Sequence, residues 1–431
     1  MKAVSFKGGL KLPVSQSGVD KPIVHIPPGE LFIIPMKQDL GPECKPLVKK
    51  KQEVQAGEMI GQSPLEHGAC IHAPVSGRVT DVTRSFVNYS GKRMSAVAIK
   101  SNGQVNSTQF PGSDNLLETM LMAGMVDYDK DTVPLSIKLD EAKLNHVDSL
   151  IVNAMDIEPY FCSRARVLIE SLDHVVDGIR IIQDFLNIQQ VFIVLDETNT
   201  GLLSDNQTRL LKDIILLPLK YKYPQAIDYL LVKAVLGKEV MCTIPCRDIM
   251  HSQDIDGLVL SVDTLAALGA GTVCTQRTIT VRDSSGSFCE NVKVHLGSPV
   301  SEIFESCSYE LDPEARLIAG GPMTGQTMAD ASMPVTKDLQ GIFILNREHI
   351  FLPPPLTCIK CGLCVDVCPA RLLPFMISGS VEKADYAQAQ RYQLSSCFEC
   401  GCCSYVCPSN IPLLHWIQFG KFEIFKQRSR L

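Results

Sequence analysis

The sequence contains no long apolar run and no excess of basic residues. No apolar stretch in its 431 residues approaches the roughly 18 residues that a membrane-spanning helix requires. Residues 1–9 lack the apolar core of a secretory signal, so we expect neither a signal peptide nor a transmembrane segment. The 41 lysines and arginines are outnumbered by 47 aspartates and glutamates, whereas nucleic-acid-binding domains usually carry a basic stripe. We therefore expect a soluble chain that has no nucleic acid among its partners.

Cysteine, by contrast, is abundant, and it is unevenly placed. Small secreted proteins with much cysteine usually form disulfides, but nine of the 17 cysteines lie in the last 75 residues at regular spacing. Such spacing is typical of ligands in a reducing compartment. Five other cysteines, which show no ligand spacing, are Cys44, Cys70, Cys274, Cys289 and Cys307.

Two copies of one cysteine motif account for most of the cysteines near the C-terminus. The segment Cys358–Cys368 reads C-x2-C-x2-C-x3-C before a proline, and Cys397–Cys407 repeats this pattern 39 residues later. In two-cluster ferredoxins the first three cysteines of such a run bind one [4Fe–4S] cluster, and the fourth binds the other. Paired zinc sites are the alternative, but zinc motifs rarely use this arrangement twice in one chain. The predicted ligands are Cys358, Cys361, Cys364 and Cys407 for one cluster, and Cys397, Cys400, Cys403 and Cys368 for the other.

The motif predicts electron transfer and no other chemistry. Cys402 is out of register beside Cys403, so we expect it to be a neighbour of the second cluster and not a ligand. No base or nucleophile accompanies the cysteines, and we predict no catalytic residue. Because the two motifs are close in sequence, the clusters should lie close in space, as an electron relay requires.

The segment after the second motif has the pattern of an amphipathic helix. Leu413, Ile417 and Ile424 fall on one helical face, with Trp416 beside them. Such a stripe usually packs against its own domain. Docking to a membrane-bound partner is the alternative, because the helix ends in the basic residues Lys426, Arg428 and Arg430.

The length and the changing texture of the chain predict a multidomain α/β protein. Residues 1–110 hold short β-type segments such as Leu31–Pro35 and Ser95–Ile99, broken by Gly and Pro. Residues 111–265 read as a Rossmann-like α/β domain, with a helix over Ser163–Leu186 between strands at Leu150–Asn153 and Val191–Leu195. Residues 266–345 suit a small β-grasp domain, and residues 346–431 a ferredoxin-like α-helical domain with the two clusters.

The first domain resembles the barrel-sandwich fold of lipoyl and biotinyl domains. The resemblance rests on Pro46–Gly61 and Ile71–Val79. Lipoyl domains carry a modified lysine at a hairpin tip, whereas the corresponding tip here, Glu66–Cys70, has no lysine. The resemblance therefore implies a structural module and not a swinging arm.

Taken in this order, the domains resemble the C subunit of Rnf complexes. The residues that carry the resemblance are Phe6–Leu10, Tyr223–Gln225, Gly320–Gly325, Cys358–Gly362 and Cys397–Cys403. This family supplies a peripheral subunit of a membrane-bound, ion-translocating ferredoxin:NAD oxidoreductase. The resemblance implies sister subunits as partners, ferredoxin as the electron source of the complex, and a position on the cytoplasmic side of the cell membrane.

The α/β domain of that family is similar to the FMN- and NADH-binding subunit of respiratory complex I. There a loop of the type G-x-G-G-A-G-F-P binds the nucleotide, and the ungapped counterpart here, Gly124–Leu139, has lost its inner glycines. Backbone N–H groups of glycines approach phosphate closely, which side chains prevent. Asp127, Asp129 and Asp131 also place negative charge where phosphates would lie. We therefore expect that neither FMN nor NADH binds.

Two neighbouring motifs of the nucleotide pocket depart from the family pattern as well. The family motif N-G-A-E-x-E-P-Y is represented by Asn153–Tyr160, and Ala226-Ile227 replaces an expected glycine pair. Cys162, Cys242 and Cys246 fall near the pocket, so an additional metal there is an alternative to isolated buried cysteines.

These features predict an electron-transfer subunit of an Rnf-type complex. It would relay electrons through two [4Fe–4S] clusters between sister subunits on the ferredoxin side and a carrier other than NAD, such as a cytochrome or a quinone-like molecule. One alternative is an NADH-binding subunit with a rebuilt flavin site. Another is a non-catalytic scaffold whose clusters stabilise a docking surface.

Overall fold

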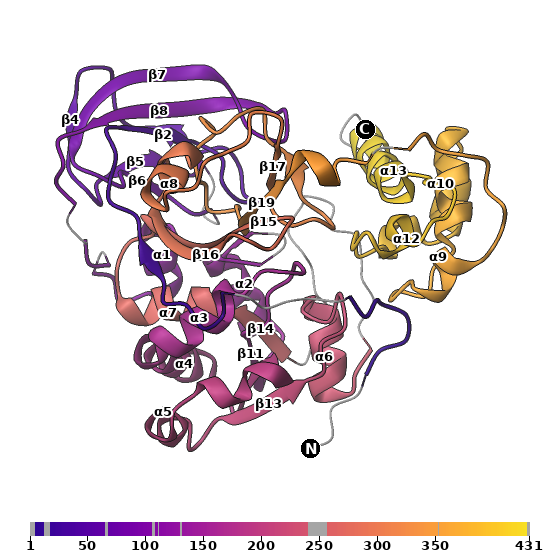
Figure 1. Cartoon of the computed structure of the whole chain (residues 1–431). Helices are drawn as coiled ribbons and strands as arrows, with labels where there is room; N and C mark the ends of the chain where they lie inside the picture. The colour runs from indigo at the N-terminus through magenta and orange to yellow at the C-terminus, as the bar shows by residue number, and fades with distance from the viewer. Residues whose placement is uncertain are drawn as a thin grey trace.

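The chain folds into four parts that succeed one another along the sequence (Figure 1). The computed structural model describes residues 5–12, 18–64, 68–105, 108–110, 112–129, 132–239, 257–351 and 353–428. Two cavities in the fourth part, and a polar network in the second, are the features that bear on function.

The N-terminal domain is a β-barrel of two antiparallel sheets. Along β2 the side chains of Phe32 and Ile34 are fully buried and Leu31 is exposed, as expected for a strand with one face on a core. The hairpin tip predicted at Glu66–Cys70 lies partly outside the described residues. The sheets are β2-β8-β7-β4 and β3-β5-β6, with β2 Leu31–Pro35, β3 Lys45–Pro46, β4 Glu53–Val54, β5 Met59–Gln62, β6 Ile71–His72, β7 Gly77–Val87 and β8 Arg93–Ser101.

The second domain is a parallel sheet covered on both faces. The strand order is β13-β12-β11-β14, and all pairs are parallel. Leu150 and Val152 pack into the core shared with α4 and α7, whereas Ile151 packs into the core shared with α6. The strands are β11 Ser149–Asn153, β12 Gln190–Asp196, β13 Ile215–Leu219 and β14 Gly257–Ser261, and the helices are α1 Leu116–Met122, α2 Leu135–Leu144, α3 Ser163–Glu170, α4 Leu172–Leu186, α5 Asp205–Leu210, α6 Asp228–Leu236 and α7 Val262–Ala270.

The single helix predicted over Ser163–Leu186 is wrong in one respect, because two helices occupy this range. The first ends at Glu170, and Ser171 between them has non-helical dihedrals, with φ −121° and ψ 25°. The second helix, α4, crosses α7 at Gly178, where a Cβ atom would lie 2.1 Å from the carbonyl oxygen of Leu265. Glycine is required for this approach.

The third domain is a six-stranded mixed sheet with one helix, α8 Val300–Ser306. Its edge strand β1 comes from the N-terminal region and pairs in parallel with β16. The order is β1-β16-β15-β19-β17-β18, with β1 Val24–His25, β15 Gln276–Asp283, β16 Cys289–His295, β17 Arg316–Ala319, β18 Gln326–Thr327 and β19 Gly341–Leu345.

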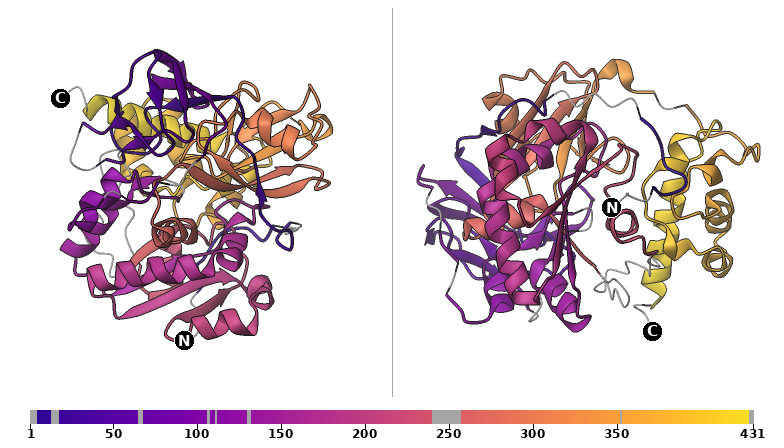
Figure 2. Two further views of the ribbon diagram at one scale, coloured as in Figure 1. Left: turned by 90° about the vertical axis from the view of Figure 1, so that its left-hand side faces the viewer. Right: turned by 90° about the horizontal axis from the view of Figure 1, so that it is seen from below.

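The C-terminal domain consists of two equivalent halves that stand beside the rest of the chain (Figure 2). Each half has a one-turn helix and then a longer helix, and the second half starts 39 residues after the first: α9 Leu363–Asp366 and α10 Pro374–Glu382, then α12 Cys402–Tyr405 and α13 Leu413–Arg428. Between the halves lies α11 Tyr386–Arg391. The predicted stripe on α13 is confirmed, since Leu413, Ile417 and Ile424 are 2%, 1% and 7% exposed.

Helices within the described residues are all too short or too polar to cross a membrane.

Candidate metal centres

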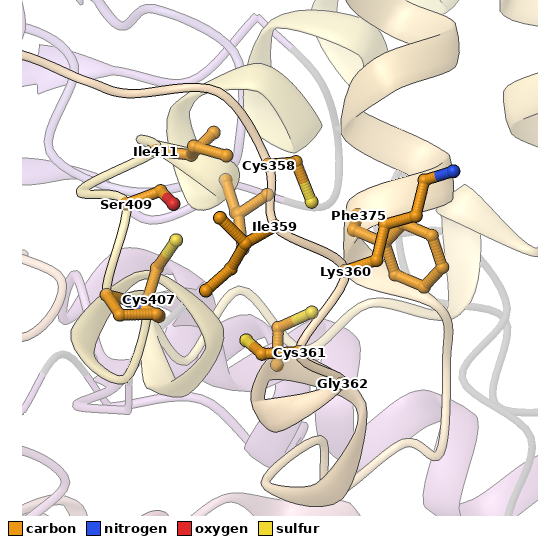
Figure 3. A pocket seen from close by; sticks show the side chains of 12 residues that line it. Cys358, Ile359, Lys360, Cys361, Gly362, Phe375, Cys407, Ser409 and Ile411 are labelled. Carbon is orange, nitrogen blue, oxygen red and sulfur yellow. The ribbon is translucent and has the colours of Figure 1, made fainter.

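The eight predicted ligands divide between two cavities of the C-terminal domain. The first cavity is lined by Cys358, Cys361, Cys364 and Cys407. Figure 3 shows the sulfur atoms of Cys358, Cys361 and Cys407 around a common space, with Ile359 between them. Three of these cysteines belong to the first motif and one to the second.

The second cavity has the complementary composition. It is lined by Cys397, Cys400 and Cys403 of the second motif, by Cys368 of the first, and also by Cys402. Thus the fold brings together the same two groups of four that the motif spacing predicts, although their ligand role itself stays a prediction.

The backbone explains how each motif turns its thiols inward. Each half places three residues in the left-handed region at equivalent positions, two between cysteines of the motif and one after its last cysteine, and each bends the chain. These positions are Lys360, Gly362 and Arg371 in the first half, and Glu399, Gly401 and Asn410 in the second.

The two cavities differ in their contact with solvent. Cys358 and Cys361 of the first cavity are exposed, as is Ile359 at 68%. In the second cavity, Cys400 and Cys403 are only 8% and 7% exposed. Burial raises the pKa of Cys397 to about 12, with the cation of Lys421 opposing this rise.

Hydrogen bonds converge on the second cavity from several segments. The backbone N–H of Leu372 donates to Cys368 Sγ and that of Glu399 to Cys397 Sγ, each at 3.3 Å. The Nζ of Lys421 donates to the carbonyl oxygen of Cys397 at 2.8 Å. Donors near cluster sulfurs tune reduction potentials, so these backbone N–H groups would act on a cluster in this buried, largely apolar cavity.

Cys402 is a buried neighbour of the second cavity, in line with its position out of register. Its side chain is fully buried against Phe6 and Tyr223. A hydrogen bond from its thiol to the Cys400 sulfur, together with burial, raises the pKa of Cys402. The raised pKa favours a protonated thiol, and the non-ligand role of Cys402 stays a prediction.

Segments far away in sequence close the second cavity from outside. The phenolic O–H of Tyr223 donates to the carbonyl oxygen of Cys400 at 2.6 Å, and the N–H of Gly9 donates to the carbonyl oxygen of Val367 at 2.8 Å. No local motif in the sequence indicates these contacts with the cysteine motifs, although both segments carry part of the resemblance to the family.

In the part of the chain that the structure describes, no three His, Cys, Asp or Glu side chains converge on a point as the ligands of one metal ion do. The four predicted ligands of each cavity instead surround a space, which suits thiols that each bind a different iron of one cluster. The described residues thus fit two [4Fe–4S] clusters. Of the suggested additional metal ligands, Cys242 and Cys246 lie outside the described residues, and Cys162 is buried next to Cys289.

The counterpart of the flavin loop folds into a hairpin whose acidic side chain points inward. Its strands are β9 Val126–Asp127 and β10 Val133–Pro134. Asp127, 1% exposed, accepts hydrogen bonds from Lys138 Nζ at 2.6 Å and from Thr264 Oγ1 at 2.7 Å. Burial alone would raise the pKa of Asp127, but Lys138 and these donors lower it overall. The carboxylate therefore remains charged and fully engaged within the protein.

A second buried ion pair holds the hairpin against α3. Arg164, 4% exposed, lies 3.4 Å from Asp129 and 3.7 Å from Asp263. It also donates to the carbonyl oxygens of Tyr128 and Met155. The predicted acidic residues Asp127 and Asp129 are thus paired with cations of this chain, while Asp131 lies outside the described residues.

The other two altered motifs also contact this chain's own residues. Asn153 Nδ2 donates to the carbonyl oxygen of Ala226 at 2.9 Å. The carboxylate of Glu158 accepts from the N–H of Met323 at 3.0 Å and from the hydroxyl of Thr324. The side chains of Asn153 and Glu158 are thus bonded to groups of this chain.

Known protein families match three parts of the chain. The RnfC barrel sandwich hybrid domain matches residues 4–104, the Nuo51 FMN-binding domain residues 120–270, and the 4Fe-4S dicluster domain residues 357–411. Fold and site together thus define a multidomain iron–sulfur protein with an α/β domain of the flavin-binding type.

Relatives cover the whole chain. The C subunit of the ion-translocating oxidoreductase complex of Rhodobacter capsulatus is 30% identical over 100% of this chain and 85% of its own length. The C subunit of the Na(+)-translocating ferredoxin:NAD(+) oxidoreductase complex of Acetobacterium woodii is 28% identical over 100% and 99%. That of the proton-translocating complex of Clostridium ljungdahlii is 28% identical over 90% and 86%. The chain belongs to this family of C subunits, which confirms the resemblance.

Proposed function

We propose that this chain is the electron-transferring C subunit of an Rnf-type, ion-translocating oxidoreductase complex. It relays single electrons through two [4Fe–4S] clusters between sister subunits on the ferredoxin side and a carrier other than NAD, as a peripheral subunit on the cytoplasmic side of the membrane. The observation that carries the proposal is the division of eight cysteines between two cavities in the pattern of a two-cluster ferredoxin.

In this proposal the clusters supply one-electron redox chemistry, and the protein sets their surroundings. Exposed Cys358 and Cys361 put the first cavity at the surface, where a partner protein can approach. Tyr223 and Gly9 shield the second cavity on the side of the α/β domain. Exchange with a partner therefore runs through the first cavity.

The loss of FMN and NADH is the second element of the proposal. Three observations support it: the hairpin lacks the inner glycines, Asp127 is paired with Lys138, and Asp129 is paired with Arg164. An entering phosphate would meet carboxylates, and it would have to displace buried cations from their partners. Such displacement costs several kcal/mol, on the order of the 3–5 kcal/mol for breaking a buried ion pair. The proposed electron path therefore does not include flavin.

The ligand sets can be tested through their crossover between motifs. Anaerobically purified chain should hold about eight irons, the content of two four-iron clusters. Cys407→Ala should remove the same cluster, with the same lost EPR signal, as Cys361→Ala, although the two residues belong to different motifs. Cys368→Ala should match Cys400→Ala in the same way, and Cys402→Ala should keep all the iron. If Cys407→Ala instead removed the signal lost in Cys400→Ala, the proposed ligand sets would be wrong.

The match to a flavin-binding domain favours one competing function, that of an NADH-oxidising subunit with a rebuilt flavin site. Flavin released on denaturation, normalised to iron, separates the two. Flavin near one per chain, with bleaching of the clusters by NADH, would establish the competitor. Flavin-free chain with full iron supports a relay to another carrier.

A further inference from the structure

Two buried thiols from different domains meet at the boundary between the α/β domain and the third domain. Cys162 directly precedes α3, and Cys289 is the first residue of β16. They are 2% and 3% exposed, carry free thiols and pack in one buried cluster, where the Cys162 thiol donates to Asn291 Oδ1 at 3.5 Å. They lie 127 positions apart in sequence, so only the fold brings them together.

The surroundings of the pair are polar and closely fitted. Asn291 Nδ2 contacts Cys162 Sγ at 3.4 Å, and the N–H of Cys162 donates to Thr280 Oγ1 at 3.1 Å. Gly18 lies against both thiols and has φ +110°. A Cβ atom on Gly18 would lie 2.6 Å from Cys289 Sγ and 3.5 Å from Cys162 Sγ. No side chain fits at that position.

Charge at the pair favours a lower pKa at Cys289 than at Cys162. The neighbouring Cys162 thiol lowers the pKa of Cys289, against the effect of burial, and the nearby cations of Arg282 and Lys21 lower it further. Arg282 is the direct cross-strand partner of Cys289, and Lys21 Nζ lies 3.1 Å from the Cys289 carbonyl oxygen. The neighbouring Cys289 sulfur and burial raise the pKa of Cys162. Cys289 is thus the better placed of the two to take up a proton during thiol–disulfide exchange.

Cys162 lines a small cavity of about 20 Å³, which is the room of about one water molecule. This cavity shares Asp196, Asn199 and Tyr221 with a larger, open one of about 560 Å³, from which a small molecule can approach. Exposed Lys11 and Asp20 line the larger cavity. Cys162 lines the smaller one, whereas Cys289 lies behind it, so an incoming reagent meets Cys162 first.

We propose that Cys162 and Cys289 form a redox-active dithiol that closes to an intrachain disulfide by exchange with a small disulfide. The sulfur of Cys162 attacks one sulfur of X–S–S–X as its proton passes to Cys289, and X–S⁻ leaves. Cys289 then gives its proton to that X–S⁻ and attacks the Cys162 sulfur, which releases the second X–S⁻ to take up a proton from water. Two electrons pass from the two cysteines to X–S–S–X, and the α/β domain becomes covalently joined to the third domain.

The test uses the iron-loaded full chain under anaerobic conditions with 2-hydroxyethyl disulfide as the probe. The chain is oxidised, alkylated, digested and analysed by mass spectrometry, and iron is measured in parallel. The expected product is one Cys162–Cys289 disulfide per chain, reversed by a dithiol reductant. Recovery of both cysteines as alkylated thiols, or pairing of either with another cysteine, would overturn the proposal.

Variants separate the two roles. Cys289→Ser should stop at a stable adduct of half the probe on Cys162, formed more slowly than in the wild type because the proton acceptor is lost. Cys162→Ser should slow modification of Cys289 roughly tenfold or more, because Cys289 lies behind the cavity wall. Cys307→Ser is the matched control and should give the wild-type disulfide. An equally fast adduct on Cys289 in Cys162→Ser would contradict the assigned order. The wild-type mapping needs no variant, so a variant that fails to fold does not leave the question open.

Discussion

Replacing Lys138 with methionine tests whether the hairpin that replaces the flavin loop depends on its buried ion pairs. Lys138 Nζ lies 2.6 Å from Asp127 and 3.1 Å from Asp228, and its side chain is 12% exposed. Methionine keeps the length and the apolar stem but removes the charge. Asp127 would then be a buried carboxylate without a cation, and we expect local stability to fall by about 3–5 kcal/mol.

Native-state hydrogen exchange is the appropriate assay, because a chain of several domains does not unfold as a single unit. The only tryptophan, Trp416, lies in the C-terminal domain and does not report on the sheet. The protection factors of peptides covering β11 and β14 should fall by roughly 100- to 5,000-fold. This range is the expected free-energy loss converted at about 1.36 kcal/mol for each tenfold change.

Two further variants make the result specific. Lys143→Met changes an exposed lysine of the same helix and should alter protection by less than about threefold. Combining Lys138→Met with Asp127→Asn removes both charges of the pair and should restore most of the protection. A loss below about tenfold in Lys138→Met would mean that the pair is solvated, and it would remove the main argument that the protein itself fills the phosphate site.

Two other predictions follow from named environments. Burial lowers the pKa of His72 to about 3, with Lys337 adding to the effect, so folding holds this imidazole neutral and stability is lost as pH falls from 6.5 towards 3. Between pH 7 and pH 5 the loss is about 2 kcal/mol, and the thermal midpoint of His72→Gln should be correspondingly less sensitive to pH. Gly401 and Gly362 have φ of +79° and +84°, but a Cβ on Gly401 would lie 2.6 Å from a backbone oxygen, that of Met323, whereas a Cβ on Gly362 meets nothing within 4 Å. The midpoint temperature of thermal unfolding of the iron-loaded chain should therefore fall further in Gly401→Ala than in Gly362→Ala. Equal decreases in the two variants would contradict the contact.

Local sequence patterns predicted the strands and the grouping of the cysteines. The strand expected at Leu31–Pro35 is β2 to the residue, and those expected at Leu150–Asn153 and Val191–Leu195 lie within β11 and β12. These segments have a burial pattern that the side-chain period records directly. The break at Ser171 was not predictable, because the apolar pattern continues across it.

Contacts between distant segments are not indicated by any local sequence pattern. The pairing of β1 with β16 joins residues about 268 positions apart, and it places part of the N-terminal region in the third domain. Likewise Cys289 shows no ligand spacing, and its relation to Cys162 exists only in the folded chain. Spacing rules detect ligands that one loop provides, and they miss pairs that tertiary packing creates.

The C-terminal repeat shows where sequence symmetry stops being informative. The two motifs agree in spacing, in their left-handed positions and in the start of the longer helices. Their surroundings differ because the second half packs on the body of the chain through Tyr223 and through Gly401 against Met323, whereas the first half meets the N-terminal segment through Gly9 at Val367. Solvent exposure and donors to sulfur both set cluster potentials, so two sites with equivalent motifs should titrate at different potentials. The difference originates in the α/β and third domains, which a comparison of the motifs alone does not include.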